Sequence, residues 1–322
     1  MNFKEIIELV ARDMSDVNIM ICERLISKVS LVNKLIGHIL STGGKRIRPI
    51  IVLLISKILK YKRQHITIAT LIEFIHMATL LHDDVVDHSD LRRGKVTSNI
   101  EFGNTASILV GDFIYTKAFQ MMISLGSLKI LSLISRAVNV IVEGELLQLT
   151  NCNNQNISIE NYMQIIYRKT AKLFEVASQS SAILAGANAC QEASLRNYGR
   201  YLGMSFQLVD DLLDYVADSK IFGKNIGGDL NEGRLTLPLL HAMKYSTSME
   251  SLLIKQAIGE GNSRDFLTVI VEVMHKYGSL EYTRECAKKE SDKAIACLSA
   301  FKPSPYLSAL KSLASIVVHR DV

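Results

Sequence analysis

Residues 73–87 read EFIHMATLLHDDVVD, and residues 206–214 read FQLVDDLLD. Each stretch places an Asp-Asp-x-x-Asp pentad in apolar sequence with helical spacing. Acidic side chains avoid such surroundings unless they are paired or bind a metal ion. On a helix, the first and fifth residues of a pentad lie on one face about a turn apart, so they can bind a common ion. The two pentads therefore predict long helices that carry acidic clusters.

The clustered carboxylates of Asp83–Asp87 and Asp210–Asp214 would repel one another without a counter-ion. Divalent cations remove that repulsion, and Mg²⁺ prefers partial shells of hard oxygen ligands completed by water and phosphate. Two such faces opposed across a helical cavity would hold a diphosphate through several Mg²⁺ ions. A single pentad is often an exposed acidic turn or a helix N-terminus, but two pentads in apolar helices argue against that alternative.

The distribution of helix breakers predicts an all-α fold. Residues 50–237 contain no proline, and we find neither a β-hairpin signal nor a run that alternates with period two. No linker rich in Pro, Gly or Ser divides the chain, so residues 1–322 are predicted to form a single domain. We expect helices at residues 2–13, 17–40, 47–60, 66–84, 104–125, 127–149, 158–186, 190–217, 234–245, 248–259, 262–277, 279–299 and 304–317.

Composition excludes several classes of protein. The formal net charge is +5, and the lysines and arginines are spread along the chain without a basic tail, so nucleic acid is not an expected partner. The five cysteines show neither a CxxC pair nor zinc spacing, which favours a reducing cytoplasmic location. The N-terminus lacks a signal peptide, and the apolar run 50–55 is too short to span a bilayer. Peripheral contact with a membrane surface stays compatible with this sequence.

Two basic segments predict an anion site. Residues 43–49 read GGKRIRP and combine three cations with two glycines and a proline suited to a first helical turn. Arg92 and Arg93 closely follow the first pentad, and a guanidinium group can bind two phosphate oxygens at once. His76 lies two turns before Asp83, where it either packs in the core or donates a hydrogen bond to a phosphate.

A glycine-rich segment follows the second pentad. Residues 222–234 read FGKNIGGDLNEGR and include Lys224 and Arg234, as expected for a lid over a phosphate, although an ordinary charged loop has a similar composition. Gln207 and the pair Lys169-Thr170 lie on predicted helices. Taken alone, none of Gln207, Lys169 and Thr170 indicates a function.

The combination resembles the trans-polyprenyl diphosphate synthases, which elongate isoprenoid chains. The matching segments, in the order found in that family, are GGKRIRP at 43–49, HDDVVDHSDLRRG at 82–94, Lys169-Thr170, FQLVDDLLD at 206–214 and FGKNIGGDLNEGR at 222–234. The amino-acid sequence of residues 73–122 is most similar to that of bacterial family members that form octaprenyl products. Arg234-Leu235 departs from the Lys-Pro that is common in the family, which implies at most altered lid dynamics because the charge is kept.

The resemblance implies an all-α helical bundle with a deep central cavity. It also implies a Mg²⁺-dependent prenyltransferase, usually a homodimer, with isopentenyl diphosphate and an allylic prenyl diphosphate as substrates. Asp83, Asp87 and Asp210 would bind Mg²⁺, with support from the other three aspartates of the pentads, Asp84, Asp211 and Asp214. Isopentenyl diphosphate would be held by Lys45, Arg48, His76 and Arg93, and the allylic diphosphate by Arg92, Lys169 and Lys224. The oxygens of Thr170 and Gln207 would face the developing allylic cation. The product would serve as a side chain of ubiquinone or menaquinone.

Product length can be argued from geometry once the family is considered. Short-chain members place a bulky aromatic residue one to two turns before the first pentad, whereas Ala78 leaves that passage open. A growing chain could pass deeper toward the region of Phe119, with Met121 or Met122 as a floor. We therefore expect a long product near octaprenyl. Two alternatives are a class I terpene cyclase, which would not need a second diphosphate pocket, and a non-catalytic subunit of a two-chain synthase, which would usually lose its aspartates.

Overall fold

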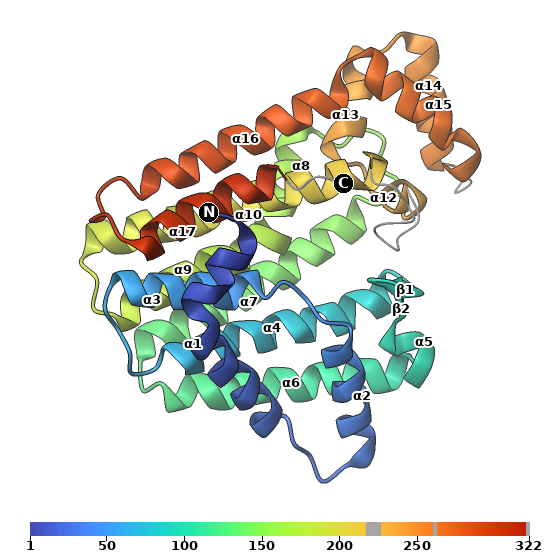
Figure 1. The fold of residues 1–322 in the computed structure, drawn as a ribbon. Coiled ribbons are helices and arrows are strands. Elements are labelled where there is room, and N and C mark those ends of the chain that lie inside the picture. Colours follow the sequence, from blue (N-terminus) through green and yellow to red (C-terminus); the bar gives the residue numbers. More distant parts are fainter. Residues whose placement is uncertain (217–226, 260–262, 320–322) are drawn as a thin grey trace. The chain divides into compact units, whose positions relative to one another are not determined.

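The computed structural model describes residues 1–216, 227–259 and 263–319, and helices make up most of them (Figure 1). The expected all-α fold is confirmed. The helices are α1 (Phe3–Arg24), α2 (Ser30–Ser41), α3 (Ile47–Ile58), α4 (His65–Val86), α5 (Ser98–Phe102), α6 (Asn104–Ser124), α7 (Leu128–Thr150), α8 (Ile159–Ile166), η1 (Tyr167–Ala171), α9 (Lys172–Leu184), α10 (Ala189–Val216), α12 (Gly228–Asn231), α13 (Leu237–Tyr245), α14 (Ser248–Gly259), α15 (Ser263–Lys276), α16 (Ser279–Cys297) and α17 (Pro305–Val318).

The described residues form two compact units. The first unit comprises Met1–Arg136, Leu173–Gly199 and Cys297–Leu313. The second comprises Ala137–Lys172, the described part of Arg200–Ala296, and the described residues from Ala314. The first aspartate pentad lies in the first unit and the second pentad in the second unit. A single functional domain over residues 1–322 stays a prediction.

The core of the first unit is built around α3 and α4. Helix α4 packs against α1, α3 and α6. In α3, all residues from Pro49 to Ser56 are buried, so this helix is covered on every side, as its continuous apolar sequence requires. Helix α4 is buried along most of its length and brings the first pentad to its C-terminal end, where Asp87 caps the helix.

A short hairpin corrects the expectation that the chain has no β-hairpin. Strands β1 (Leu91–Arg92) and β2 (Lys95–Val96) pair antiparallel, with Leu91 opposite Val96. The two turn residues, Arg93 and Gly94, both have positive φ, 53° and 73°, as a type I′ turn requires. The sequence signal was weak because the strands have two residues each and arginine takes the position that asparagine or aspartate usually occupies.

The core of the second unit joins helices that are distant in sequence. Leu208 and Leu212 of α10 belong to one buried cluster with Ile254 of α14 and Ile270 of α15. Helices α13, α14 and α15 pack pairwise, and α13 also contacts α8. This cluster supports the segment of α10 that carries the second pentad.

A π-helical turn interrupts the segment expected to form one helix at 158–186. The chain forms α8, then the single turn η1, and then α9. A π-turn adds one residue to an α-helix, and such turns are frequent at functional sites. Lys169 and Thr170 lie within η1. The turn leaves no mark in the hydrophobic spacing, so the sequence pattern did not predict it.

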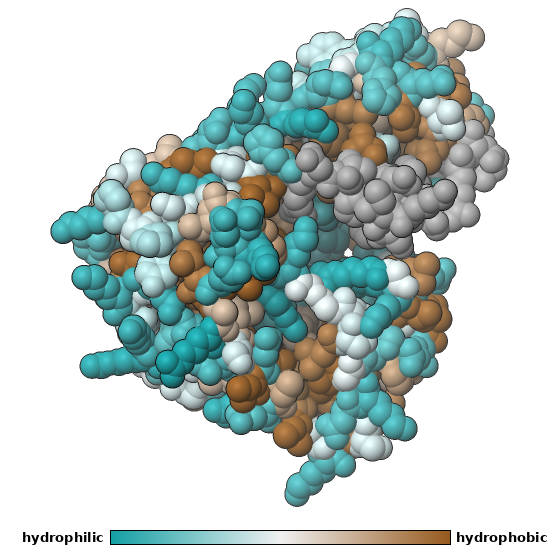
Figure 2. All heavy atoms as spheres, in the orientation of Figure 1, coloured by the Kyte–Doolittle hydropathy of each residue, from teal (hydrophilic) through white to brown (hydrophobic). Residues whose placement is uncertain are grey.

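Some apolar side chains stay on the surface. Helix α6 exposes Leu109 and Ile123, the latter at 70%, and Figure 2 shows brown hydrophobic atoms on the face where Figure 1 draws α6. Among the described helices, α4 alone has the length and composition of a membrane span, and 67% of its apolar window is buried inside the protein. The buried core helix of a folded domain has the same properties.

Candidate active site

Four arginines surround His76 in the first unit. Burial lowers the pKa of His76 well below its ordinary value, and the positive charges of Arg48, Arg92, Arg93 and Arg46, in decreasing order, add to this effect. The imidazole is therefore neutral at pH 7, so it acts as a hydrogen-bonding group. We call these five residues the arginine–histidine cluster. It provides the concentration of guanidinium groups that an anionic substrate requires.

The loop before α3 positions two of these arginines. Arg46 adopts a left-handed conformation with φ 49° and forms an ion pair with Glu73, which is buried on α4. Arg48 lies in the first turn of α3, with its guanidinium carbon 4.3 Å from the centroid of the Phe174 ring. Lys45, predicted to bind the same substrate, is exposed on this loop.

The hairpin positions the other two arginines. Arg92 donates from Nε and Nη2 to Oδ1 of Asp84, at 2.8 and 2.7 Å, and the Asp84 side chain is buried. Arg93 donates to the backbone carbonyl of Gly43, and its guanidinium lies so close to Gly44 that a Cβ atom there would be 2.6 Å from Nη1. The glycines at 43 and 44 thus allow the hairpin to reach the loop before α3.

The first pentad separates into two kinds of carboxylate. Asp84 is buried and bound by Arg92. Asp83 and Asp87 are partly exposed, and the amide of Asp87 donates to the carbonyl of Asp83 at 2.8 Å, which places them one turn apart at the end of α4. These two are the residues predicted to bind Mg²⁺, and their position leaves them accessible to solvent and substrate.

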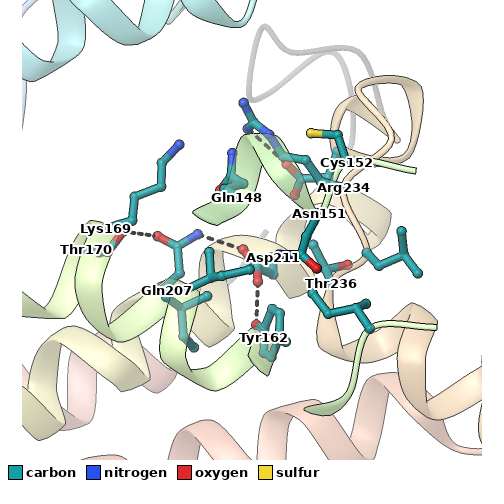
Figure 3. Close-up of a pocket in the computed structure, with 15 residues that line it drawn as sticks. Gln148, Asn151, Cys152, Tyr162, Lys169, Thr170, Gln207, Asp211, Arg234 and Thr236 are labelled. Carbon is teal, nitrogen blue, oxygen red and sulfur yellow. Dashed lines mark hydrogen bonds and ion pairs between the residues drawn. The ribbon is translucent and has the colours of Figure 1, made fainter. Parts of the chain in front are cut away.

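A hydrogen-bond chain organises the second half of the candidate site (Figure 3). Thr170 donates to Oε1 of Gln207 at 2.7 Å, and Nε2 of Gln207 donates to Oδ1 of Asp211 at 2.6 Å. The hydroxyl of Tyr162 donates to the other oxygen of Asp211. We call these four residues the Gln207 cluster. They line a pocket of about 70 Å³ together with Lys169.

Lys169 lies at the same pocket and forms an ion pair with Glu145 at 2.8 Å. With its amide oriented to satisfy its neighbours, Gln148 accepts from Lys169 Nζ at 3.2 Å and from Arg234 Nε at 2.9 Å. Arg234 also pairs with Glu232 at 2.8 Å. The pocket therefore contains two cations, Lys169 and Arg234, and the structure brings the predicted residues Lys169, Thr170 and Gln207 together.

Asp211 and Tyr162 form a buried pair. Burial raises the pKa of Asp211 to about 8, repulsion from Asp229 adds to the rise, and hydrogen bonds from Tyr162 and Gln207 oppose it. Burial, and then the negative charge of Asp211, raise the pKa of Tyr162 well above its ordinary value. The tyrosine hydroxyl therefore keeps its proton at neutral pH and acts as a donor that fixes the carboxyl group.

The outer aspartates of the second pentad lie nearer the surface. Asp214 accepts from the amides of Gly228 and Asp229 at 3.2 and 3.0 Å, so it anchors the start of α12. Asp210, the third predicted Mg²⁺ ligand, is exposed on α10. Lys224, predicted to bind the allylic diphosphate, lies outside the described residues.

Tyr162→Phe is expected to lower the free energy of unfolding by about 1–2 kcal/mol, because the buried Asp211 carboxyl loses a donor. Tyr61→Phe is the control, since its hydroxyl makes only a long contact of 3.4 Å with Gln64. Urea denaturation followed by circular dichroism measures both variants. Equal midpoints for the two variants would show that the Tyr162 hydrogen bond does not support the pocket.

The residues present are suitable for Mg²⁺. Asp83 and Asp87 on α4, and Asp210 on α10, offer carboxylate oxygens at partly or fully exposed positions, whereas Asp84 and Asp211 are buried. Within the described part of the chain, no three His, Cys, Asp or Glu side chains form a group able to hold a metal ion. Asp83 with Asp87, and Asp210 by itself, supply only one or two carboxylates each. Such incomplete ligand sets suit Mg²⁺, which keeps several waters and binds substrate phosphates. That the two pentads oppose each other stays a prediction.

The predicted chain-length residues are buried on α4 and α6, two helices that pack against each other. Ala78 is fully buried on α4, and Met121 and Met122 are buried on α6, whereas Phe119 is 42% exposed. Phe119 therefore belongs partly to the surface. A role of Ala78 and Met122 in product length stays a prediction.

Sequence reasoning missed several residues of the candidate site. Arg46 was part of the GGKRIRP segment but had no assigned role, and the structure shows it with a left-handed backbone and an ion pair with Glu73. Tyr162 resembles any apolar helix residue in sequence, and Gln148 and Glu145 are ordinary polar residues of a helix. Spatial proximity, which no local pattern contains, identifies them.

An all-α fold with an arginine-rich anion site and two aspartate pentads defines the class of isoprenoid synthases. The sequence profile of the polyprenyl synthetase family matches residues 29–274. The chain is 58% identical to octaprenyl diphosphate synthase of Escherichia coli over the whole of both chains. It is 50% identical to the enzyme of the same name from Haemophilus influenzae, over 100% of this chain and 98% of that protein.

Solved structures agree with these relatives. The polyprenyl synthase of Caulobacter crescentus, complexed with calcium and isoprenyl diphosphate, has a TM-score of 0.95 at 39% identity and covers 98% of this chain and 97% of its own. A decaprenyl diphosphate synthase from Rhodobacter capsulatus has a TM-score of 0.94 at 38% identity, with 99% of each chain covered. The chain therefore belongs to the polyprenyl synthetase family. It is an enzyme of long-chain all-trans prenyl elongation, which excludes the cyclase and the non-catalytic subunit.

Proposed function

We propose that this protein adds isopentenyl diphosphate repeatedly to an allylic diphosphate, with farnesyl diphosphate as the starter, and forms an all-trans product near octaprenyl for quinone side chains. The observation that carries this proposal is the arginine–histidine cluster beside Asp83 and Asp87, because a neutral imidazole among four guanidinium groups suits a diphosphate. The two octaprenyl diphosphate synthases at 58% and 50% identity support the product class.

The substrates bind to distinct groups in this proposal. Arg48, Arg93, Lys45 and His76 hold isopentenyl diphosphate, and His76 donates a hydrogen bond to it without adding charge. Arg92, Lys169 and Lys224 hold the allylic diphosphate. Three cations on one diphosphate orient its carbon–oxygen bond and stabilise the negative charge that builds up when this bond breaks.

Asp83, Asp87 and Asp210 are the residues that would hold Mg²⁺. When bound, the ion acts as a Lewis acid that stabilises the leaving diphosphate. The calcium ion named with the Caulobacter enzyme supports dependence on a divalent cation, and the carboxylate donors favour Mg²⁺. Arg92 keeps Asp84 paired, so the neighbouring ligands are held at the end of α4.

The developing allylic cation is stabilised by oxygen atoms of the Gln207 cluster. Thr170 donates its proton to Gln207, so the remaining lone pairs of its hydroxyl are available to the cation. The double bond of isopentenyl diphosphate attacks the cation, and the released diphosphate removes the proton. No side chain forms a covalent bond to the substrate.

Product analysis tests the proposed function. The protein is incubated with Mg²⁺, farnesyl diphosphate and labelled isopentenyl diphosphate, and the products are separated by reversed-phase chromatography. A ladder that ends near eight isoprene units is expected from the named relatives. Cyclic hydrocarbon, or no consumption of isopentenyl diphosphate, would contradict the proposal.

Ala78→Phe is expected to shorten the main product, because the aromatic ring would fill a fully buried position on α4 one to two turns before Asp83. Ala78→Ser is the matched control, since a hydroxyl adds little volume. Chain length is compared at equal amounts of folded enzyme, because overpacking costs about 1–3 kcal/mol. An unchanged product distribution in Ala78→Phe would rule out a chain passage at this residue.

We propose that the protein forms a homodimer through exposed apolar side chains of α6 and α7. Helix α6 exposes Leu109 and Ile123. Helix α7 exposes Val142, Leu146 and Leu149, which share one face at a spacing of four and three residues. A second copy of the chain could cover both surfaces. Light scattering, which measures molar mass, tests the homodimer by comparing Leu146→Glu with the unchanged chain. We expect a monomer for the variant.

We also propose a cytoplasmic location with peripheral membrane contact during product release. All five cysteines are free thiols, as a reducing compartment allows. The long apolar product has low solubility in water, which favours its transfer to a lipid surface. Fractionation of cells into soluble and membrane pools tests both the cytoplasmic location and the membrane contact.

A further inference from the structure

Gly144 of α7 faces the π-turn η1 without room for a side chain. A Cβ atom at residue 144 would lie 2.7 Å from Cβ of Arg168, 2.9 Å from the backbone nitrogen of Lys169 and 3.1 Å from the carbonyl carbon of Arg168. Two of these atoms belong to the backbone, so they cannot turn away as the end of a flexible side chain does. Helix α7 and η1 therefore approach each other as closely as glycine allows.

The neighbours of Gly144 hold the same turn on both sides. Glu143 pairs with Arg168 at 2.9 Å, and Glu145 pairs with Lys169 at 2.8 Å. The two glutamates on either side of Gly144 thus pair with two consecutive residues of η1, Arg168 and Lys169. This contact lies within the second unit and fixes both the distance and the register of the two elements.

The turn held in this way carries two groups of the candidate site. Lys169 lines the pocket, and Thr170 begins the hydrogen-bond chain to Gln207 and Asp211 (Figure 3). An outward shift of η1 would move the Thr170 hydroxyl away from Gln207 and Lys169 away from the pocket. Displacement of a reacting group by about 1 Å can cost about 100-fold in rate.

We propose that Gly144 is a positioning residue, whose missing side chain sets the position at which η1 presents Lys169 and Thr170 to the allylic substrate. This inference rests on the proposed function of the same site. Glycine is required here for close packing, because Gly144 lies inside a regular helix and its backbone conformation is open to any residue.

Gly144→Ala tests the inference by steady-state kinetics with farnesyl diphosphate, isopentenyl diphosphate and Mg²⁺. We expect kcat to fall about 10- to 100-fold and KM for farnesyl diphosphate to rise. KM for isopentenyl diphosphate should stay within about twofold, because none of its proposed ligands Arg48, His76 and Arg93 belongs to η1.

Two controls separate positioning from loss of stability. Gly37→Ala places the same methyl group in helix α2, where nothing lies within 4 Å, and should leave kcat and both KM values unchanged. Ile254→Ala removes a buried side chain of the second unit and should lower the unfolding temperature without changing kcat of the folded enzyme. If Gly144→Ala behaves as either control does, the inference is wrong.

Deletion of Arg168 is a second test, which applies also if Gly144→Ala fails to fold. Removing one residue converts a π-turn to α-helix and leaves the flanking helices α8 and α9 in register. We expect a folded protein that has lost most of its turnover, because Thr170 no longer reaches Gln207. Full activity of this deletion would overturn the inference, whereas inactivity of the unchanged protein would overturn the proposed function itself.

Discussion

Asp83→Ala is expected to lower turnover about 100- to 1,000-fold, while helix content and unfolding temperature stay close to those of the unchanged protein. The reason is that a metal ligand contributes several kcal/mol of transition-state stabilisation, and each 1.36 kcal/mol is a factor of ten in rate. Asp83 is partly exposed at the end of α4, so its loss removes no buried apolar side chain from the core. Single-turnover kinetics with farnesyl diphosphate measures the effect.

Asp90→Ala is the matched control, since Asp90 is an exposed aspartate of the same segment and lies outside the pentad. Its turnover should be unchanged at saturating Mg²⁺. Isothermal titration of the cation in the presence of diphosphate gives a second readout. Near-normal turnover of Asp83→Ala, or unchanged cation affinity, would show that Asp83 does not bind the metal.

Arg92→Ala is expected to reduce both stability and activity. The Asp84 carboxylate is buried and receives two hydrogen bonds from Arg92, so removal of the guanidinium leaves a buried charge unpaired. Breaking a buried pair costs about 3–5 kcal/mol, and we expect about 2 kcal/mol here because Arg92 is 26% exposed. Turnover should fall about 100-fold, because a cation of the proposed allylic diphosphate site is lost.

The double variant Arg92→Ala with Asp84→Asn separates the two effects. Neutralising Asp84 removes the unpaired charge, so denaturant melts should show recovery of more than half of the lost stability. Activity should stay low, since the guanidinium is still missing. Recovery of activity along with stability would mean that Arg92 only holds Asp84 and does not bind substrate.

The helical architecture was largely predictable because long apolar repeats and scarce proline define it locally. The expected segments 47–60 and 279–299 correspond to α3 and α16 within a few residues. The N-terminal region differs, since α1 runs without a break through residues 13–17 and ends at Arg24. We expected a break between the segments 2–13 and 17–40, but buried Met14 and Val17 continue the helix face that packs on the core.

The features that depend on long-range contacts were not predictable. The π-turn at 167–171 packs closely against Gly144, which is distant in sequence, and the hairpin at 91–96 turns through a left-handed arginine. Likewise, the residue types of the GGKRIRP segment predicted an anion site, but not that Arg46 would pair with Glu73. Residue type and spacing thus identified the chemistry, whereas the partners that orient each group came from the fold.

In the proposed mechanism, both pentads bind a single diphosphate through metal ions. A crystal structure with Mn²⁺ and a non-reactive thio-analogue of farnesyl diphosphate tests it most directly, because Mn²⁺ is located by its anomalous scattering. We predict cations coordinated by Asp83 and Asp87 and by Asp210, with one diphosphate bridging them. Cations at one pentad only, or two pentads that contact separate ligands, would show that the pentads do not share one diphosphate.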